Sequence, residues 1–124
     1  MDRKICLLAG FDKNNKIQDY VVFLVQELSK ISDVYYFADS SIPKNELLKI
    51  KAYTKYAESS LHHGKYFGSW QYLMHYIGWK TLETYDEMII CNDSIYGPMT
   101  NIKDIFDYME LRGYDFWGLT ENYH

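Results

Sequence analysis

Residues 85–98 read YDEMIICNDSIYGP, and this stretch is the best guide to the architecture of the chain. A short apolar run ends abruptly in Asn92, Asp93 and Ser94, and a Gly-Pro pair closes the stretch. In an alternating α/β protein, a buried strand delivers polar side chains in this way to a crevice outside the carboxyl ends of the sheet. We therefore expect a ligand site here. The alternative is a plain strand-to-loop turn, because Asn, Asp and Ser are common turn formers.

Other apolar runs predict the partners of this strand. Residues 4–10, KICLLAG, indicate a first, central strand that is buried on both faces, and residues 33–38, DVYYFA, indicate a second parallel strand. Residues 114–120 predict a final strand, whereas residues 52–59 fit either a strand or more helix.

Segments with apolar side chains at helical spacing separate these strands. The first helix has its stripe on Ile17, Tyr20, Val21, Leu24, Leu28 and Ile31. The second begins near Pro43, and the third runs from an N-cap at Ser69 to a C-cap at Gly78. The last carries Ile102, Ile105, Phe106 and Met109. Strands that alternate with helices predict one α/β domain over residues 1–124, a three-layer α/β/α sandwich with a mostly parallel sheet.

Composition excludes several classes of protein. The formal net charge of −4 gives no broad basic surface, which argues against nucleic-acid binding. Cys6 and Cys91 lie in predicted buried strands and indicate packed, reduced thiols. No apolar run is long enough for a transmembrane segment and no signal peptide is evident, so we expect a cytoplasmic protein. The 13 Tyr, 6 Phe and 3 Trp suit either ligand clefts or ordinary packing.

Polar residues also follow the other strands at the same predicted edge. Gly10, Phe11 and Asp12 follow the first strand, and Asp39 and Ser40 follow the second. A ligand edge and a simple turn remain equally good interpretations of both.

The paired histidines at 62 and 63 have no third ligand at zinc spacing, so we predict a solvated loop there. The Gly-rich dinucleotide fingerprint, the P-loop and the nucleophile elbow are all missing from the sequence.

Three segments together resemble the rhamnan synthesis protein F family of bacterial polysaccharide biosynthesis. They are residues 64–70 (GKYFGSW), residues 85–98 and residues 115–120 (DFWGLT). The family is similar to GT-A glycosyltransferases. The resemblance implies a nucleotide-sugar-binding sandwich that transfers a sugar, typically rhamnose from dTDP-rhamnose, to a polysaccharide or lipid-linked acceptor. It also implies other polysaccharide-synthesis enzymes as partners. The donor-binding positions expected from the strand ends and this resemblance are Gly10, Phe11, Asp12, Asp39, Ser40, Gly68, Trp70, Asn92, Asp93, Ser94 and Tyr96.

Two departures from the family pattern bear on the chemistry. GT-A enzymes bind a divalent metal at an Asp-x-Asp strand tip, but the matching residues here are Asn92, Asp93 and Ser94, with one carboxylate. We expect weak binding of Mg²⁺ or Mn²⁺ by Asp93, or hydrogen bonds from Asp93 to ribose or sugar hydroxyls. The family pattern before Trp70 is close to Gly-Tyr-Asp-Phe-Gly-Ser-Trp, and its acidic residue is replaced or deleted here.

The chain stops at His124, before the half in which GT-A enzymes build the acceptor site. We therefore expect either the N-terminal part of a longer transferase or a non-catalytic fragment that acts as a binding or assembly module. Glu121 is a weak candidate base, and we assign no catalytic residue. A homodimer is left open, as is a place at the inner face of the membrane. A flavodoxin-like or receiver-like signalling domain is a weaker alternative.

Overall fold

The computed structural model describes residues 3–93 of the chain, and helices and strands alternate along them. The elements are β1 (Lys4–Gly10), α1 (Asp19–Ser29), β2 (Asp33–Ala38), α2 (Lys44–Lys51), β3 (Tyr56–Ser59), α3 (Lys65–Ile77), α4 (Trp79–Leu82) and β4 (Glu87–Asn92). The helix predicted around residues 102–109 and the strand predicted at 114–120 lie outside the described residues.

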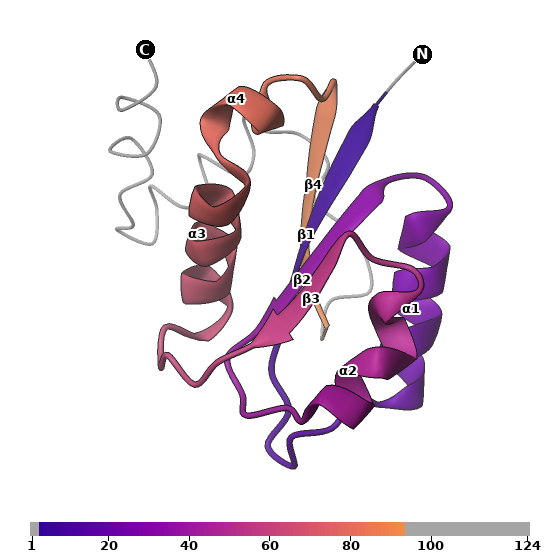
Figure 1. Cartoon of the computed structure of the whole chain (residues 1–124), viewed down its shortest axis with the longest axis vertical. Helices are drawn as coiled ribbons and strands as arrows, with labels where there is room; N and C mark the ends of the chain where they lie inside the picture. The colour runs from indigo at the N-terminus through magenta and orange to yellow at the C-terminus, as the bar shows by residue number, and fades with distance from the viewer. Residues whose placement is uncertain (1–2, 94–124) are drawn as a thin grey trace.

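The described strands form one parallel sheet in the order β3-β2-β1-β4 (Figure 1). The chain therefore steps outward from β1 to β3 and then returns past both strands to β4. Crossovers between parallel strands are right-handed, so this reversal moves the connecting helix to the other face of the sheet. Figure 1 shows the result, with α1 and α2 on one face and α3 on the other.

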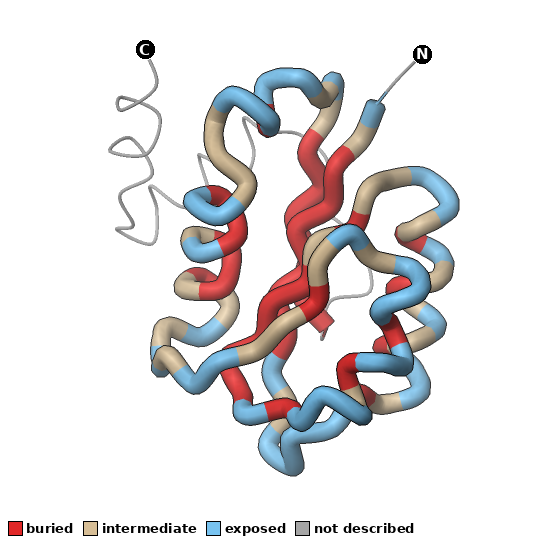
Figure 2. The backbone as a smooth tube through the Cα atoms, viewed as in Figure 1, coloured by how far each residue is buried: buried red, intermediate tan, exposed pale blue. Residues whose placement is uncertain are grey.

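Each face of the sheet has its own apolar core. Along β1, Ile5 and Leu7 join the core under α3, whereas Cys6 and Leu8 join the core under α1 and α2. β1, β2 and β4 are buried along most of their length, whereas β3 is mostly of intermediate burial (Figure 2). These features confirm the predicted three-layer α/β/α sandwich with β1 at its centre.

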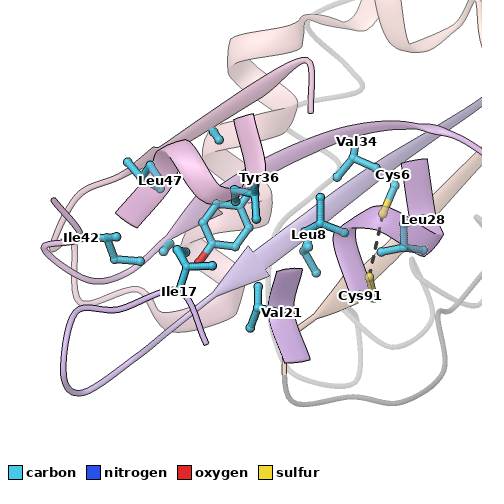
Figure 3. Close-up of a cluster of buried hydrophobic side chains, with 14 of the residues drawn as sticks. Cys6, Leu8, Ile17, Val21, Leu28, Val34, Tyr36, Ile42, Leu47 and Cys91 are labelled. Atoms are coloured by element: carbon cyan, nitrogen blue, oxygen red, sulfur yellow. Dashed lines mark hydrogen bonds between the residues drawn. The ribbon is translucent and has the colours of Figure 1, made fainter. Parts of the chain in front are cut away.

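The two cysteines lie in the core under α1 and α2, where Figure 3 shows them side by side. Their sulfur atoms are 3.9 Å apart and unbridged. The hydrogen bond to Cys91, together with burial, raises the pKa of the Cys6 thiol. Both cysteines are therefore packed thiols, as the sequence predicted.

The predicted apolar stripe of α1 was wrong at two positions. In α1, Tyr20 is 55% exposed, and the buried stripe is formed by Val21, Val25 and Leu28. A helix that lies on a sheet buries a narrow stripe, and position 20 lies beside it. Ile31 is 54% exposed because it follows the end of the helix.

The start of α3 also differs from the prediction. The helix begins at Lys65, and Ser69 is fully buried inside it instead of capping it. Gly64 takes the capping position, and Gly78 ends the helix as predicted. The ambiguous residues 52–59 contain the short strand β3. No helix within residues 3–93 has the length and apolar character needed to cross a membrane.

Candidate functional site at the carboxyl edge of the sheet

The direction of the strand order reverses between β1 and β4. In open α/β sheets, a ligand crevice forms outside the carboxyl ends of the strands at such a reversal. The residues that leave β1 and β4 at this point are Phe11 and Asp93. The backbone N–H of Phe11 donates a hydrogen bond of 2.9 Å to Oδ2 of Asp93. The structure thus joins two of the predicted site segments directly.

Asp93 differs from the other aspartates at this edge, Asp12 and Asp39, in the direction of its pKa shift. It is 6% exposed, and its second oxygen, Oδ1, accepts a 3.1 Å hydrogen bond from the hydroxyl of Tyr66 on α3. Burial raises the pKa of Asp93 above its usual value, in spite of these two donors. A carboxylate has about four lone-pair positions, and among residues 3–93 Phe11 and Tyr66 each donate to one oxygen of Asp93. The described part of the chain thus leaves acceptor positions on Asp93 that a ligand donor could use.

Asp39 has a different environment at the end of β2. Its Oδ1 accepts hydrogen bonds from the backbone N–H groups of His62 and His63, and its Oδ2 accepts one from that of Lys65, all at 2.8–2.9 Å. Burial acts to raise its pKa, but these donors lower it below its usual value. His63 and Lys65 adopt positive φ angles of 63° and 55°, which L-residues rarely take. The Asp39 carboxylate therefore organises the loop that leads into α3.

Asp12 also shapes its own loop. Its Oδ2 accepts hydrogen bonds from the N–H groups of Asn14 and Lys16, and its Oδ1 accepts one from the amide of Gln18. Burial opposes the effect, but these bonds lower the pKa of Asp12. Its own N–H donates to Oγ of Ser40 at 2.9 Å, which ties the loops after β1 and β2 together.

His62 is a structural residue that the sequence analysis missed. Its Nδ1 accepts a 3.0 Å hydrogen bond from the N–H of Gly64, so in the neutral ring Nε2 bears the hydrogen and donates to Oγ of Ser69. A Cβ on Gly68 would lie 2.8 Å from the ring. The loop that was predicted to be solvated is therefore attached to the first turns of α3 through the His62 ring. The four-residue spacing of Gly64 and Gly68, which puts both on one side of a helix, was the available signal.

The remaining predicted residues support the edge. A Cβ on Gly10 would lie 2.2 Å from Oη of Tyr36, so this close approach requires glycine. Trp70 is 3% exposed, and its indole N–H donates to the Cys91 carbonyl at 3.1 Å, which fixes α3 to the end of β4. Asn92 is buried at the same strand end. Ser94 and Tyr96 lie outside the described residues.

A metal ion held by the protein alone needs several oxygen or nitrogen ligands that converge on one position. Among residues 3–93, no three His, Cys, Asp or Glu side chains converge on a common position. Asp93 lies at the ends of β1 and β4, whereas the carboxylates of Asp12 and Asp39 hold the loops after β1 and β2.

The fold and this edge define a class: an α/β sandwich whose parallel strands deliver polar side chains to one crevice. The model of the family described as rhamnan synthesis protein F matches residues 34–124. The chain belongs to this family, and so to the machinery of rhamnan synthesis, a form of polysaccharide biosynthesis. The match begins after β1 and α1. Neither a curated protein nor a solved structure gave a significant match.

Proposed function

We propose that this chain binds a nucleotide sugar, with dTDP-rhamnose as the first candidate, as the donor-binding domain of a glycosyltransferase. The donor would lie at the carboxyl edge of the sheet, over the crevice between β1 and β4. Membership of the rhamnan synthesis family supports a sugar as one part of the ligand. The position of the crevice, where the strand order reverses, supports a nucleotide as the other part.

The observation that carries this proposal is the contact between Asp93 and the Phe11 N–H. It places a buried carboxylate with spare acceptor capacity at the point where the direction of the strand order reverses. The ribose and sugar hydroxyls of a nucleotide sugar are donors that such an acceptor can bind.

Thermal shift tests this proposal with a panel of nucleotide sugars, each with and without Mg²⁺ or Mn²⁺. We expect dTDP-rhamnose to raise the Tm of the chain in a saturable way, because a ligand that binds only the folded state stabilises it. The Asp93→Asn variant should fold and show a much smaller rise. If no nucleotide sugar raises the Tm at millimolar concentration under either condition, the proposal is wrong.

A second candidate is a non-catalytic binding or assembly module of the same pathway. Asn92 and Asp93 provide one formal charge where the metal-binding tip of a GT-A enzyme has two, and both oxygens of Asp93 bind protein donors. Such a module binds the donor without turnover. Sugar transfer or donor hydrolysis by the purified chain, lost in Asp93→Asn, would exclude this second candidate.

A further inference from the structure

The hydroxyl of Tyr36 lies at the carboxyl end of β1. Tyr36 pairs with Leu8 across β1 and β2, and both side chains belong to the core under α1 and α2. The ring extends from there to Gly10, where a Cβ would lie 2.2 Å from the hydroxyl oxygen. Figure 3 shows this oxygen pointing toward Ile17, which precedes α1. The fold thus brings a hydroxyl from the interior of β2 to the carboxyl edge of the sheet.

This hydroxyl makes no hydrogen bond to any of residues 3–93, although Tyr36 as a whole is only 1% exposed. Within the same residues, every buried polar side-chain atom that is closed off from solvent has a partner. The Tyr36 oxygen therefore lies where a small polar group can reach it. A phenylalanine ring would fill the same apolar space, whereas a hydroxyl that gives up water without a new partner is costly.

The charges around the hydroxyl define the partner that it suits. Burial is the main cause that raises the pKa of Tyr36, and the nearby carboxylates of Asp93 and Asp12 raise it further. The hydroxyl therefore stays protonated at neutral pH and can donate a hydrogen bond. The same two carboxylates repel an anion such as phosphate. The best partner is thus a neutral oxygen.

We propose that the Tyr36 hydroxyl donates a hydrogen bond to a neutral oxygen of the ligand that binds at the crevice beside Asp93. This inference rests on the proposed function, because it adds a binding residue to the same site. Tyr36 supplies a donor and Asp93 an acceptor, so together they suit hydroxyl groups, which both donate and accept. Gly10 contributes by having no side chain, which leaves room for the Tyr36 hydroxyl.

The test is the Tyr36→Phe variant, which removes only the hydroxyl. Calorimetric titration with dTDP-rhamnose should show about a fivefold loss of affinity, the usual effect of one neutral hydrogen bond. The Tm of the ligand-free variant should stay equal or rise, because no protein partner is left unpaired. Tyr35→Phe is the matched control: Tyr35 is the neighbour of Tyr36 in β2 but packs against the core on the other face, so binding should not change.

A parallel titration with dTDP locates the neutral oxygen. If Tyr36→Phe loses affinity equally for dTDP and dTDP-rhamnose, the oxygen belongs to the nucleoside. If only the affinity for dTDP-rhamnose falls, the oxygen belongs to the sugar. Either result supports the proposal.

The inference and the proposed function fail in different ways. Wild-type affinity of Tyr36→Phe for both ligands overturns the inference and leaves the proposed function in place. A lower Tm of ligand-free Tyr36→Phe also overturns the inference, because it would show that the hydroxyl has a partner within the protein. If the wild-type chain binds neither ligand at millimolar concentration, the proposed function is wrong and the inference falls with it.

Discussion

Three aspartates follow strands at the same edge of the sheet, and their surroundings give them different roles. Asp12 and Asp39 each accept three hydrogen bonds, which stabilise their charged forms. Asp93 has two donors and a buried position that disfavours its charge. The sequence could place all three at strand ends but could not distinguish them, because that difference depends on which distant N–H groups reach each carboxylate.

The matched variants Asp39→Asn and Asp93→Asn should have opposite effects on stability. An amide at position 39 keeps one oxygen and turns an NH₂ group toward backbone donors, so we expect a loss of about 1–3 kcal/mol in the free energy of unfolding. At position 93 the amide removes a charge that burial disfavours, its oxygen can accept from the Phe11 N–H and its NH₂ can donate to the Tyr66 hydroxyl, so the free energy of unfolding at pH 7 should stay equal or rise. Urea unfolding of both variants checks this, and a large loss at position 93 would count against a ligand role.

The loss of stability at acid pH should reveal the contribution of the Asp39 carboxylate to the free energy of unfolding. Its folded-state pKa is lower than its usual value of 3.8, so its contribution to stability is present above pH 3.8 and is lost as pH falls through the folded-state pKa. We expect Asp39→Asn to flatten the decline of stability below about pH 4, where the wild type loses this contribution. An unchanged acid limb in urea titrations from pH 6 to pH 2, at about half-unit steps, would contradict the role assigned to Asp39.

At the scale of elements, the first turn of α3 depends on a close contact between Gly68 and the ring of His62. Alanine in place of an interior helical glycine usually stabilises by about 1 kcal/mol. At position 68 the added Cβ would lie 2.8 Å from the ring, which must then shift away from Ser69. We expect Gly68→Ala to destabilise the protein.

The control for this contact is the double variant that combines His62→Ala with Gly68→Ala. In the background of His62→Ala the ring is absent, so Gly68→Ala should become neutral or stabilising. Thermal unfolding of the wild type, both single variants and the double variant gives the coupling between the two sites. If Gly68→Ala has the same effect in both backgrounds, the ring contact does not determine the start of α3.

The elements that the sequence predicted well are those with a strong local signal. β1 and β2 are continuous apolar runs with polar or glycine boundaries, and their observed bounds match the prediction. The start of α3 was missed because Gly64 and Gly68 resemble helix breakers and Ser69 resembles a cap. Only the tertiary contacts that His62 and Asp39 make with the start of α3 show that the helix includes Gly68 and Ser69.

At the scale of the whole molecule, the strand order was the property that the sequence could not supply. The alternation of elements predicted a parallel sheet, but several orders satisfy it. The order β3-β2-β1-β4 determines that Phe11 meets Asp93. The candidate donor site follows from this order.

The most direct test of the account is an amide chemical-shift titration of the ¹⁵N-labelled chain with dTDP-rhamnose. The N–H of Phe11 binds Asp93 at the carboxyl edge, and the N–H of Arg3 binds Asp86 at the opposite edge, which provides an internal control. We predict a saturable shift of the Phe11 amide and no shift of the Arg3 amide. A Phe11 amide that stays in place at saturating ligand, or shifts centred on Arg3, would contradict the account.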